Sequence, residues 1–113
     1  MMIDKIFEAL SSPPRRRILA YLSKTDMTAG EIVQRFADAM SQPAISKHLF
    51  VLENAGLVWR EKRGQNVHYG LREDVLTGAL AGFLGEVCPR SRPFRRESAA
   101  AAKRKMGRPE DKT

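Results

Sequence analysis

The chain has 113 residues, of which 42% are hydrophobic and 29% are charged. This length suits one domain and is too short for two, and the single cysteine, Cys88, excludes a fold held by disulfides within the chain. No apolar run reaches the roughly 18 residues of a membrane span, and the first ten residues contain no apolar segment suited to export. We therefore expect a cytoplasmic protein.

The excess positive charge is concentrated at the C-terminus. Residues 1–88 contain 11 Lys and Arg against 10 Asp and Glu, whereas residues 89–113 contain 9 against 3. The second segment has too few large apolar side chains to offset the entropy lost on ordering. We therefore predict a folded domain over 1–88 and a basic, disordered tail over 89–113. The formal charge of +7 suggests a polyanionic partner but says little about the folded part.

Two short helices are predicted at the start of the chain. The first covers residues 3–10, where apolar side chains recur at helical spacing. Ser12 is the expected N-cap of the second helix, with Pro13 in its first turn. The three arginines of 15–17 follow at once, where positive charge opposes the helix dipole. We therefore expect a negative group close to them.

Two more helices follow, joined by a tight turn. Thr28 and Glu31 fit a capping box and predict a helix over 28–39. Ser41 is the expected N-cap of a helix over 41–56, which Gly56 ends in a left-handed conformation. The inward side chains of these two helices are predicted to be Ile32, Val33, Phe36, Ile45, Leu49 and Leu52.

The hydrophobic period then changes from 3.6 to 2. Residues 57–62 and 66–71 are predicted strands of a hairpin with its tip at 63–65, and a strongly apolar helix runs from Val75 to Val87. The fold class is therefore mainly α with a β-hairpin wing, in the order α-α-α-α-β-β-α. Two capped helices followed by a basic-tipped hairpin predict a winged helix-turn-helix.

Several segments of the chain resemble the ArsR-type bacterial repressors. The matching segments are residues 9–19, the run Ser-Gln-Pro-Ala-Ile-Ser-Lys-His-Leu at 41–49, residues 55–58 and the wing at 63–71. The resemblance covers about residues 3–87 and is strongest to the SdpR-like branch, which lacks the known metal sites. It implies a homodimer that is paired through its first and last helices and represses transcription at an inverted repeat.

The resemblance also implies which residues contact double-stranded DNA. Gln42 has an amide that can pair with adenine, Ser46 is small enough for close approach, and cations of the wing can neutralise phosphates. The recognition-helix candidates are Ser41, Gln42, Pro43, Ala44, Ser46, Lys47 and His48, and the wing candidates are Lys62, Arg63, Gln65 and Asn66.

Three alternatives stay open for this surface. The polar side of the helix could simply be solvated. His48 either contacts a base or forms a hydrogen bond within the turn. Phe50 stands where the family often has a cation, and it either packs inward or presents an aromatic edge toward DNA.

The first and last helices are the candidate dimer surface. Their apolar stripes exceed what one small protomer can cover, and a symmetric dimer would bury them. The alternative is that the last helix caps a monomeric core. The candidate dimerisation residues are Ile3, Ile6, Phe7, Leu10, Leu76, Leu80, Phe83, Leu84 and Val87.

No sensor or catalytic site is predicted. Thr28 and Gly30 stand where the best-known metal site of the family has cysteines, and the redox branch needs two cysteines per chain. We expect no metal, no cofactor and no membrane partner, and we expect that the protein is not an enzyme, because no nucleophile–base pair can be assembled. The effector stays unknown. The alternative function is a protein-interaction module whose basic tail binds nucleic acid non-specifically. If the protein is a repressor, we expect it to be associated with the nucleoid.

Overall fold

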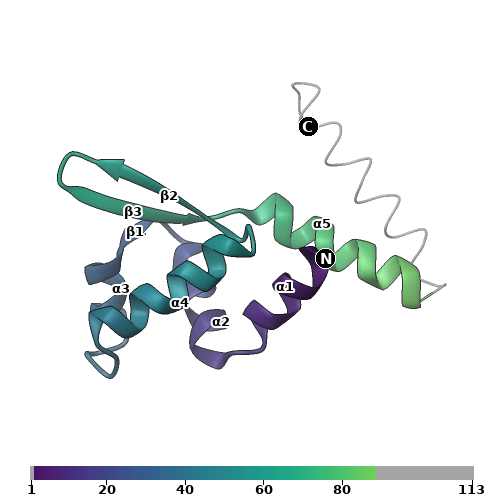
Figure 1. The fold of residues 1–113 in the computed structure, drawn as a ribbon, viewed down its shortest axis with the longest axis horizontal. Helices are drawn as coiled ribbons and strands as arrows, with labels where there is room; N and C mark the ends of the chain where they lie inside the picture. The colour runs from purple at the N-terminus through teal and green to yellow at the C-terminus, as the bar shows by residue number, and fades with distance from the viewer. Residues whose placement is uncertain (1, 89–113) are drawn as a thin grey trace. The chain divides into compact units, whose positions relative to one another are not determined.

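The computed structural model describes residues 2–88, and the predicted tail at 89–113 lies outside the described residues. The elements follow one another as α1 (Met2–Leu10), α2 (Pro13–Leu22), β1 (Met27–Thr28), α3 (Ala29–Arg35), α4 (Gln42–Asn54), β2 (Val58–Arg63), β3 (Asn66–Leu71) and α5 (Glu73–Val87) (Figure 1). The predicted order of helices and hairpin is confirmed, and β1 is a strand that the sequence pattern did not predict. One unit ends at Leu76 and a second begins at Thr77, within α5.

The side chains predicted as N-caps begin their helices in the structure. The hydroxyl of Ser12 accepts a hydrogen bond from the backbone N–H of Arg15 at 3.4 Å. The hydroxyl of Ser41 accepts one from the N–H of Ala44 at 3.3 Å. Thr28 forms the complete capping box with Glu31: its hydroxyl accepts from the N–H of Glu31 at 3.2 Å, and its own N–H donates to the carboxylate of Glu31 at 2.9 Å. These bonds satisfy backbone donors that no helical carbonyl can reach.

α3 is shorter than the predicted helix over 28–39, because it ends at Arg35. Ala37 and Asp38 have φ angles of 53° and 61°, in the left-handed region. Their N–H groups donate to the carbonyls of Gln34 and Val33, at 3.0 and 3.3 Å. This is the hydrogen-bond pattern of a Schellman motif, which usually has glycine where this chain has Ala37. Because no glycine stands here, the residue pattern contains no signal that the helix ends at Arg35.

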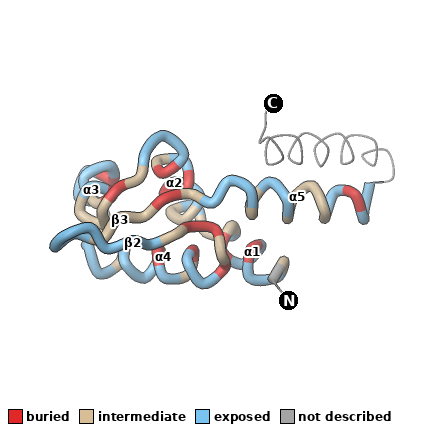
Figure 2. Tube along the Cα trace, turned by 90° about the horizontal axis from the view of Figure 1, so that it is seen from above, coloured by how far each residue is buried: buried red, intermediate tan, exposed pale blue. Residues whose placement is uncertain are grey.

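α4 supplies the centre of the core of the first unit. Ile45, Leu49 and Leu52 are completely buried and share one side of it, and Figure 2 shows buried positions recurring along α4. The helix contacts α1, α2, α3 and β2. The helix ends at Asn54, two residues earlier than predicted, and Gly56 has the predicted left-handed conformation, with a φ of +81°. The N–H of Leu57 then donates to the carbonyl of Leu52 at 3.0 Å, and both of these side chains are fully buried.

The sheet is antiparallel and has the order β1-β3-β2. Arg63 pairs with Asn66, so the hairpin loop consists of Gly64 and Gln65 alone. The predicted strand over 57–62 and tip at 63–65 are therefore wrong by one residue, and Arg63 belongs to β2. The reason is the φ of +61° at Gly64, because a two-residue hairpin loop with the twist of the strands needs a positive φ at its first position.

Gly70 is buried under the indole ring of Trp59, its partner across the β2–β3 pair. A Cβ atom at Gly70 would lie 2.1 to 2.6 Å from three atoms of that ring. The absence of a side chain at this position therefore allows Trp59 to lie close against the sheet.

We expect Gly70→Ala to lower the free energy of unfolding by about 1–3 kcal/mol, because the ring or the strand must move to accommodate the methyl group. Urea unfolding of the two proteins measures this difference. Gly78→Ala is the matched control, since a Cβ atom at Gly78 meets nothing within 4 Å and alanine favours a helix by about 1 kcal/mol. Equal stability of Gly70→Ala and the parent chain would contradict the close contact with Trp59.

Candidate nucleic-acid interface

The predicted recognition residues lie on the outward side of α4 and at its N-terminus. The exposed members are Ser41, Gln42, Pro43, Ser46 and Lys47, and the half-buried members are Ala44 and His48. The buried stripe of α4 faces the core, so its opposite side is held toward solvent. The structure thus leaves most of these side chains exposed at the N-terminus of α4 and on its side away from the core.

Phe50 does not pack inward. Its side chain belongs to the outward surface of α4, and the residue is 66% exposed. Of the two alternatives that the sequence left open for Phe50, the structure excludes burial. The sequence-based choice of recognition residues did not include Phe50, although its place one turn after Ser46 was a usable signal.

Arg15 connects α1, α2 and α4. Its guanidinium donates to the carbonyls of Ala9, at 2.8 Å, and Glu8, at 3.1 Å, near the C-terminus of α1. A third N–H donates to Nδ1 of His48 on α4, at 3.3 Å. The bond of His48 is therefore made to α2, rather than within the turn as the sequence analysis had considered.

The arginines at the start of α2 are stabilised by the end of α1. Arg16 donates to the carbonyl of Leu10 at 2.7 Å, beside the bonds of Arg15. The carbonyls at a helix C-terminus carry partial negative charge and lack helical partners. They are the negative group that the sequence analysis expected. Arg17 instead lies over the ring of Phe36, 5.4 Å from its centroid.

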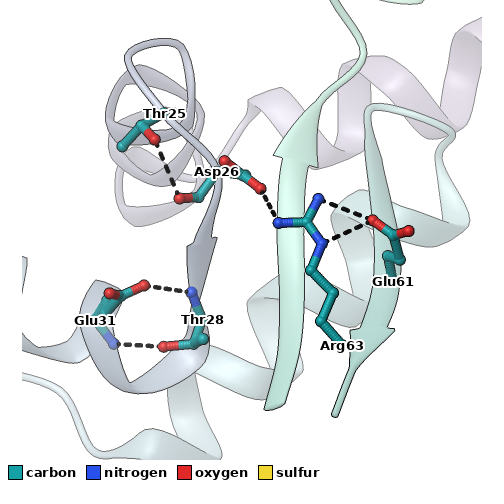
Figure 3. Close-up of polar contacts among 6 residues, drawn as sticks. All are labelled: Thr25, Asp26, Thr28, Glu31, Glu61 and Arg63. Atoms are coloured by element: carbon teal, nitrogen blue, oxygen red, sulfur yellow. Dashed lines mark hydrogen bonds and ion pairs between the residues drawn. The ribbon is translucent and has the colours of Figure 1, made fainter.

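The wing is stabilised by Arg63. Its guanidinium lies 2.8 Å from a carboxylate oxygen of Asp26, just before β1, and 2.8 Å from Glu61 on β2 (Figure 3). It also lies 5.6 Å from the centroid of the Trp59 ring. Trp59, Glu61 and Arg63 are at alternate positions of one strand and so share one face of the sheet. Arg63 thus connects β2 to the segment that leads into β1.

These contacts reduce the positive charge that Arg63 presents. Its hydrogen bond lowers the pKa of Asp26, and hydrogen bonds to Glu61 and Asp26 raise the pKa of the Arg63 guanidinium. Both carboxylates lie 2.8 Å from the guanidinium, so the charge of Arg63 is directed at them rather than at an incoming phosphate. The other wing candidates, Lys62, Gln65 and Asn66, are exposed. Within residues 2–88, ion pairs of the wing involve Arg63 and not Lys62.

The candidate dimerisation residues differ in exposure. In α1, Ile6 is completely buried and belongs to the core, Ile3 and Leu10 are half-buried, and Phe7 is exposed. In α5, Leu76 and Leu80 are half-buried. Phe83, Leu84 and Val87 are 39%, 41% and 54% exposed. The exposed apolar surface of α5 therefore comes from its C-terminal half.

Residues 2–88 contain neither a metal-binding cluster nor a membrane-spanning helix. In this part of the chain, no three His, Cys, Asp or Glu side chains come together as they would around a metal ion. Likewise, no helix described here combines the length and the apolar character needed to cross a membrane.

Comparison with known proteins identifies the family. Residues 12–59, from the N-cap of α2 to Trp59, match the model of the bacterial regulatory proteins of the arsR family. The transcriptional repressor SdpR of Bacillus subtilis (strain 168) is 38% identical over 82 residues, which are 73% of this chain and 89% of that protein. This chain belongs to the ArsR family. It is a DNA-binding transcriptional regulator, as the sequence analysis predicted, and the alternative of a protein-interaction module is not favoured.

Solved structures agree with the ArsR fold. The crystal structure of an ArsR family transcriptional regulator has 30% sequence identity and a TM-score of 0.67, covering 75% of this chain and 84% of that one. The ArsR-like transcriptional regulator from Rhodococcus sp. RHA1 has 26% identity and a TM-score of 0.72, covering 90% of this chain and 92% of that one. The three relatives described here are thus named as regulators or repressors rather than enzymes.

The lowered pKa of His48 predicts that the stability of the folded protein depends on pH. Burial, and then the charge of Arg15, lower the pKa of His48 below its ordinary 6.5, because both disfavour the imidazolium. The unfolded chain therefore takes up a proton at His48 at a higher pH than the folded chain. As pH falls through 6.5, this difference lowers the free energy of unfolding. Urea unfolding at several pH values between 7.5 and 5.5 measures this loss of free energy of unfolding.

The matched variant for this prediction is His48→Gln. Its amide oxygen can still accept a hydrogen bond from Arg15 but does not titrate. We expect His48→Gln to lose less stability than the parent chain over the same pH range. The same loss in both proteins would show that His48 does not contribute to the pH dependence.

Proposed function

We propose that this ArsR-family protein is a repressor that binds an inverted-repeat operator in bacterial DNA as a homodimer and acts within the nucleoid. The observation that carries the proposal is the outward side of α4, where Gln42, Ser46 and Lys47 are exposed above a completely buried stripe. The 38% identity to a protein named a transcriptional repressor supports it. Repression is steric: a protein bound at the operator excludes RNA polymerase.

In this proposal α4 enters the major groove. The amide of Gln42 forms a bidentate pair with adenine, whereas Ala44 and Ser46 are small enough to admit the helix close to the base edges. Lys47, opposite the buried stripe, and His48, toward the edge of the helix surface, meet the DNA backbone. Ser41 and Pro43 bring the N-terminus of α4, with its partial positive charge, toward a phosphate.

The wing contributes contacts with the flanking backbone. We assign the phosphate contact to Lys62, because Arg63 is already bound by Asp26 and Glu61. Arg63 then acts by fixing the hairpin against the β1 segment. Gln65 and Asn66, at the exposed tip, donate hydrogen bonds to phosphate or sugar oxygens.

The homodimer buries the exposed apolar side chains of the first and last helices. Phe7 on α1 and the C-terminal half of α5, with Phe83, Leu84 and Val87, are exposed large apolar residues that association would remove from water. A two-fold axis presents each of these apolar surfaces twice and so covers both copies. The two copies of α4 then enter successive major grooves about 10 base pairs apart.

We expect Gln42→Ala to change the selected DNA sequence at one symmetric base position. Loss of a bidentate pair with a base removes about 1–3 kcal/mol of discrimination at that position. The measurement is selection of genomic fragments by the full chain and by the variant at roughly physiological salt. Enrichment of the same inverted repeat with an unchanged sequence preference would contradict the role of Gln42.

Lys62→Ala is the matched control for that selection. A phosphate contact carries no sequence information, so this variant should bind all sequences more weakly by a similar factor and reduce the salt exponent by about one. A change confined to one base position would contradict the assignment of Lys62. If the full chain enriches no shared motif, the proposed operator binding itself is wrong.

We expect Leu84→Asp to shift the protein from dimer to monomer. A carboxylate in an apolar interface must be desolvated or protonated, which weakens association by at least about 2 kcal/mol. Light scattering over a concentration series measures the change. Glu86→Lys is the control, because Glu86 is exposed on the same helix and lies outside the apolar stripe. A Leu84→Asp dimer as tight as the parent would contradict the interface.

A further inference from the structure

The most exposed large apolar residue in the described part of the chain lies on α4, a helix that contributes no residue to the candidate dimer surface. Phe50 is 66% exposed, compared with 37% for Phe7 on α1 and 39% to 54% for Phe83, Leu84 and Val87 on α5. Those four residues belong to the proposed dimer interface. Phe50 is therefore an exposed aromatic ring that the dimer leaves unexplained.

The position of Phe50 aligns it with the proposed base-reading residues. Successive residues of a helix are about 100° apart, which places Phe50 within about 40° of Ser46 around the axis of α4. Helical side chains point back toward the N-terminus, so the ring extends toward the preceding turn. That turn contains Ser46 and Lys47, both exposed. The ring thus lies among the side chains that would enter the groove.

The small volume of Ser46 leaves the ring accessible from the groove side. A phenyl ring exposed to this degree adds little to the stability of the fold, because most of its apolar surface stays in water. It also has no donor or acceptor with which to read a base edge. Any discrimination that it provides must come from apolar contact.

Only one of the four bases of DNA offers an apolar group in the major groove, the C5-methyl of thymine. We propose that Phe50 is a specificity-determining residue that contacts a thymine methyl group in each half-site of the operator. This inference rests on the proposed entry of α4 into the major groove. It adds to the proposed base contacts of α4 one base that is recognised without hydrogen bonds.

The helix geometry restricts where that thymine lies. Gln42 and Phe50 are separated by about 12 Å along the axis of α4, at roughly 1.5 Å per residue. Base pairs are spaced by about 3.4 Å, and the ring leans back toward Gln42. The thymine should therefore lie about two to four base pairs from the base that Gln42 reads.

The experiment replaces thymine with deoxyuridine, which lacks only the methyl group. The full chain first selects its operator, and each thymine of the half-site is then replaced symmetrically while the dissociation constant is measured. We expect one position at which the parent chain loses about fourfold in affinity per half-site, the equivalent of one buried methyl group. At that position Phe50→Ala should bind the thymine and uracil operators equally.

Two further variants complete the experiment. Phe50→Leu keeps an apolar side chain and should retain part of the preference for thymine. Asn54→Ala removes an exposed side chain one turn later on the same surface. This variant should retain the full preference for thymine. Phe50 is largely exposed, so thermal unfolding of Phe50→Ala should match that of the parent and show that lost affinity does not reflect lost folding.

Several results would overturn the inference. If no thymine position responds to uracil, or if Phe50→Ala responds as strongly as the parent, Phe50 does not read a methyl group. If Phe50→Ala becomes monomeric, the ring contacts a second copy of the chain instead. Each of these leaves the selected operator intact, whereas the absence of any enriched motif would overturn both this inference and the proposed function.

Discussion

The burial of one side of α4 is the constraint on which the rest of the structure depends. Ile45, Leu49 and Leu52 are completely buried, and the helix contacts α1, α2, α3 and β2. Apolar packing fixes which side faces inward but is non-directional. The hydrogen bonds of Arg15 are directional: its planar guanidinium donates to two carbonyls of α1 and to the ring of His48 on α4. The outward side of α4 is therefore presented in a defined orientation.

The local signals of the sequence predicted much of the fold. Ser12, Thr28 and Ser41 begin helices because the capping oxygen and the backbone donor are three residues apart, which short-range geometry determines. The end of α3 was not predictable in this way, because Ala37 adopts a conformation that glycine usually provides. β1 was missed because a two-residue strand exists only through its pairing with β3.

The candidate site was predicted less completely than the fold. Helical periodicity placed Gln42, Ser46 and Lys47 on an exposed surface, as the structure has them, whereas their contacts with DNA are predictions. The partners of Arg15 and Arg63 could not be inferred, since they depend on segments that only tertiary packing brings together. The hydrogen bond of Arg63 to Asp26 spans 37 positions of the chain. Whether Phe50 was buried or exposed likewise depended on packing.

The two-residue loop of the wing constrains how the hairpin can change length in evolution. Each added residue pair extends both strands by one position and moves everything beyond it to the opposite face of the sheet. A single such pair inserted between Trp59 and Arg63 would separate the guanidinium from the indole ring that it covers. Wings that keep this contact should therefore keep the four-residue spacing of Trp59 and Arg63, and longer hairpins should carry their additional residue pairs beyond Arg63.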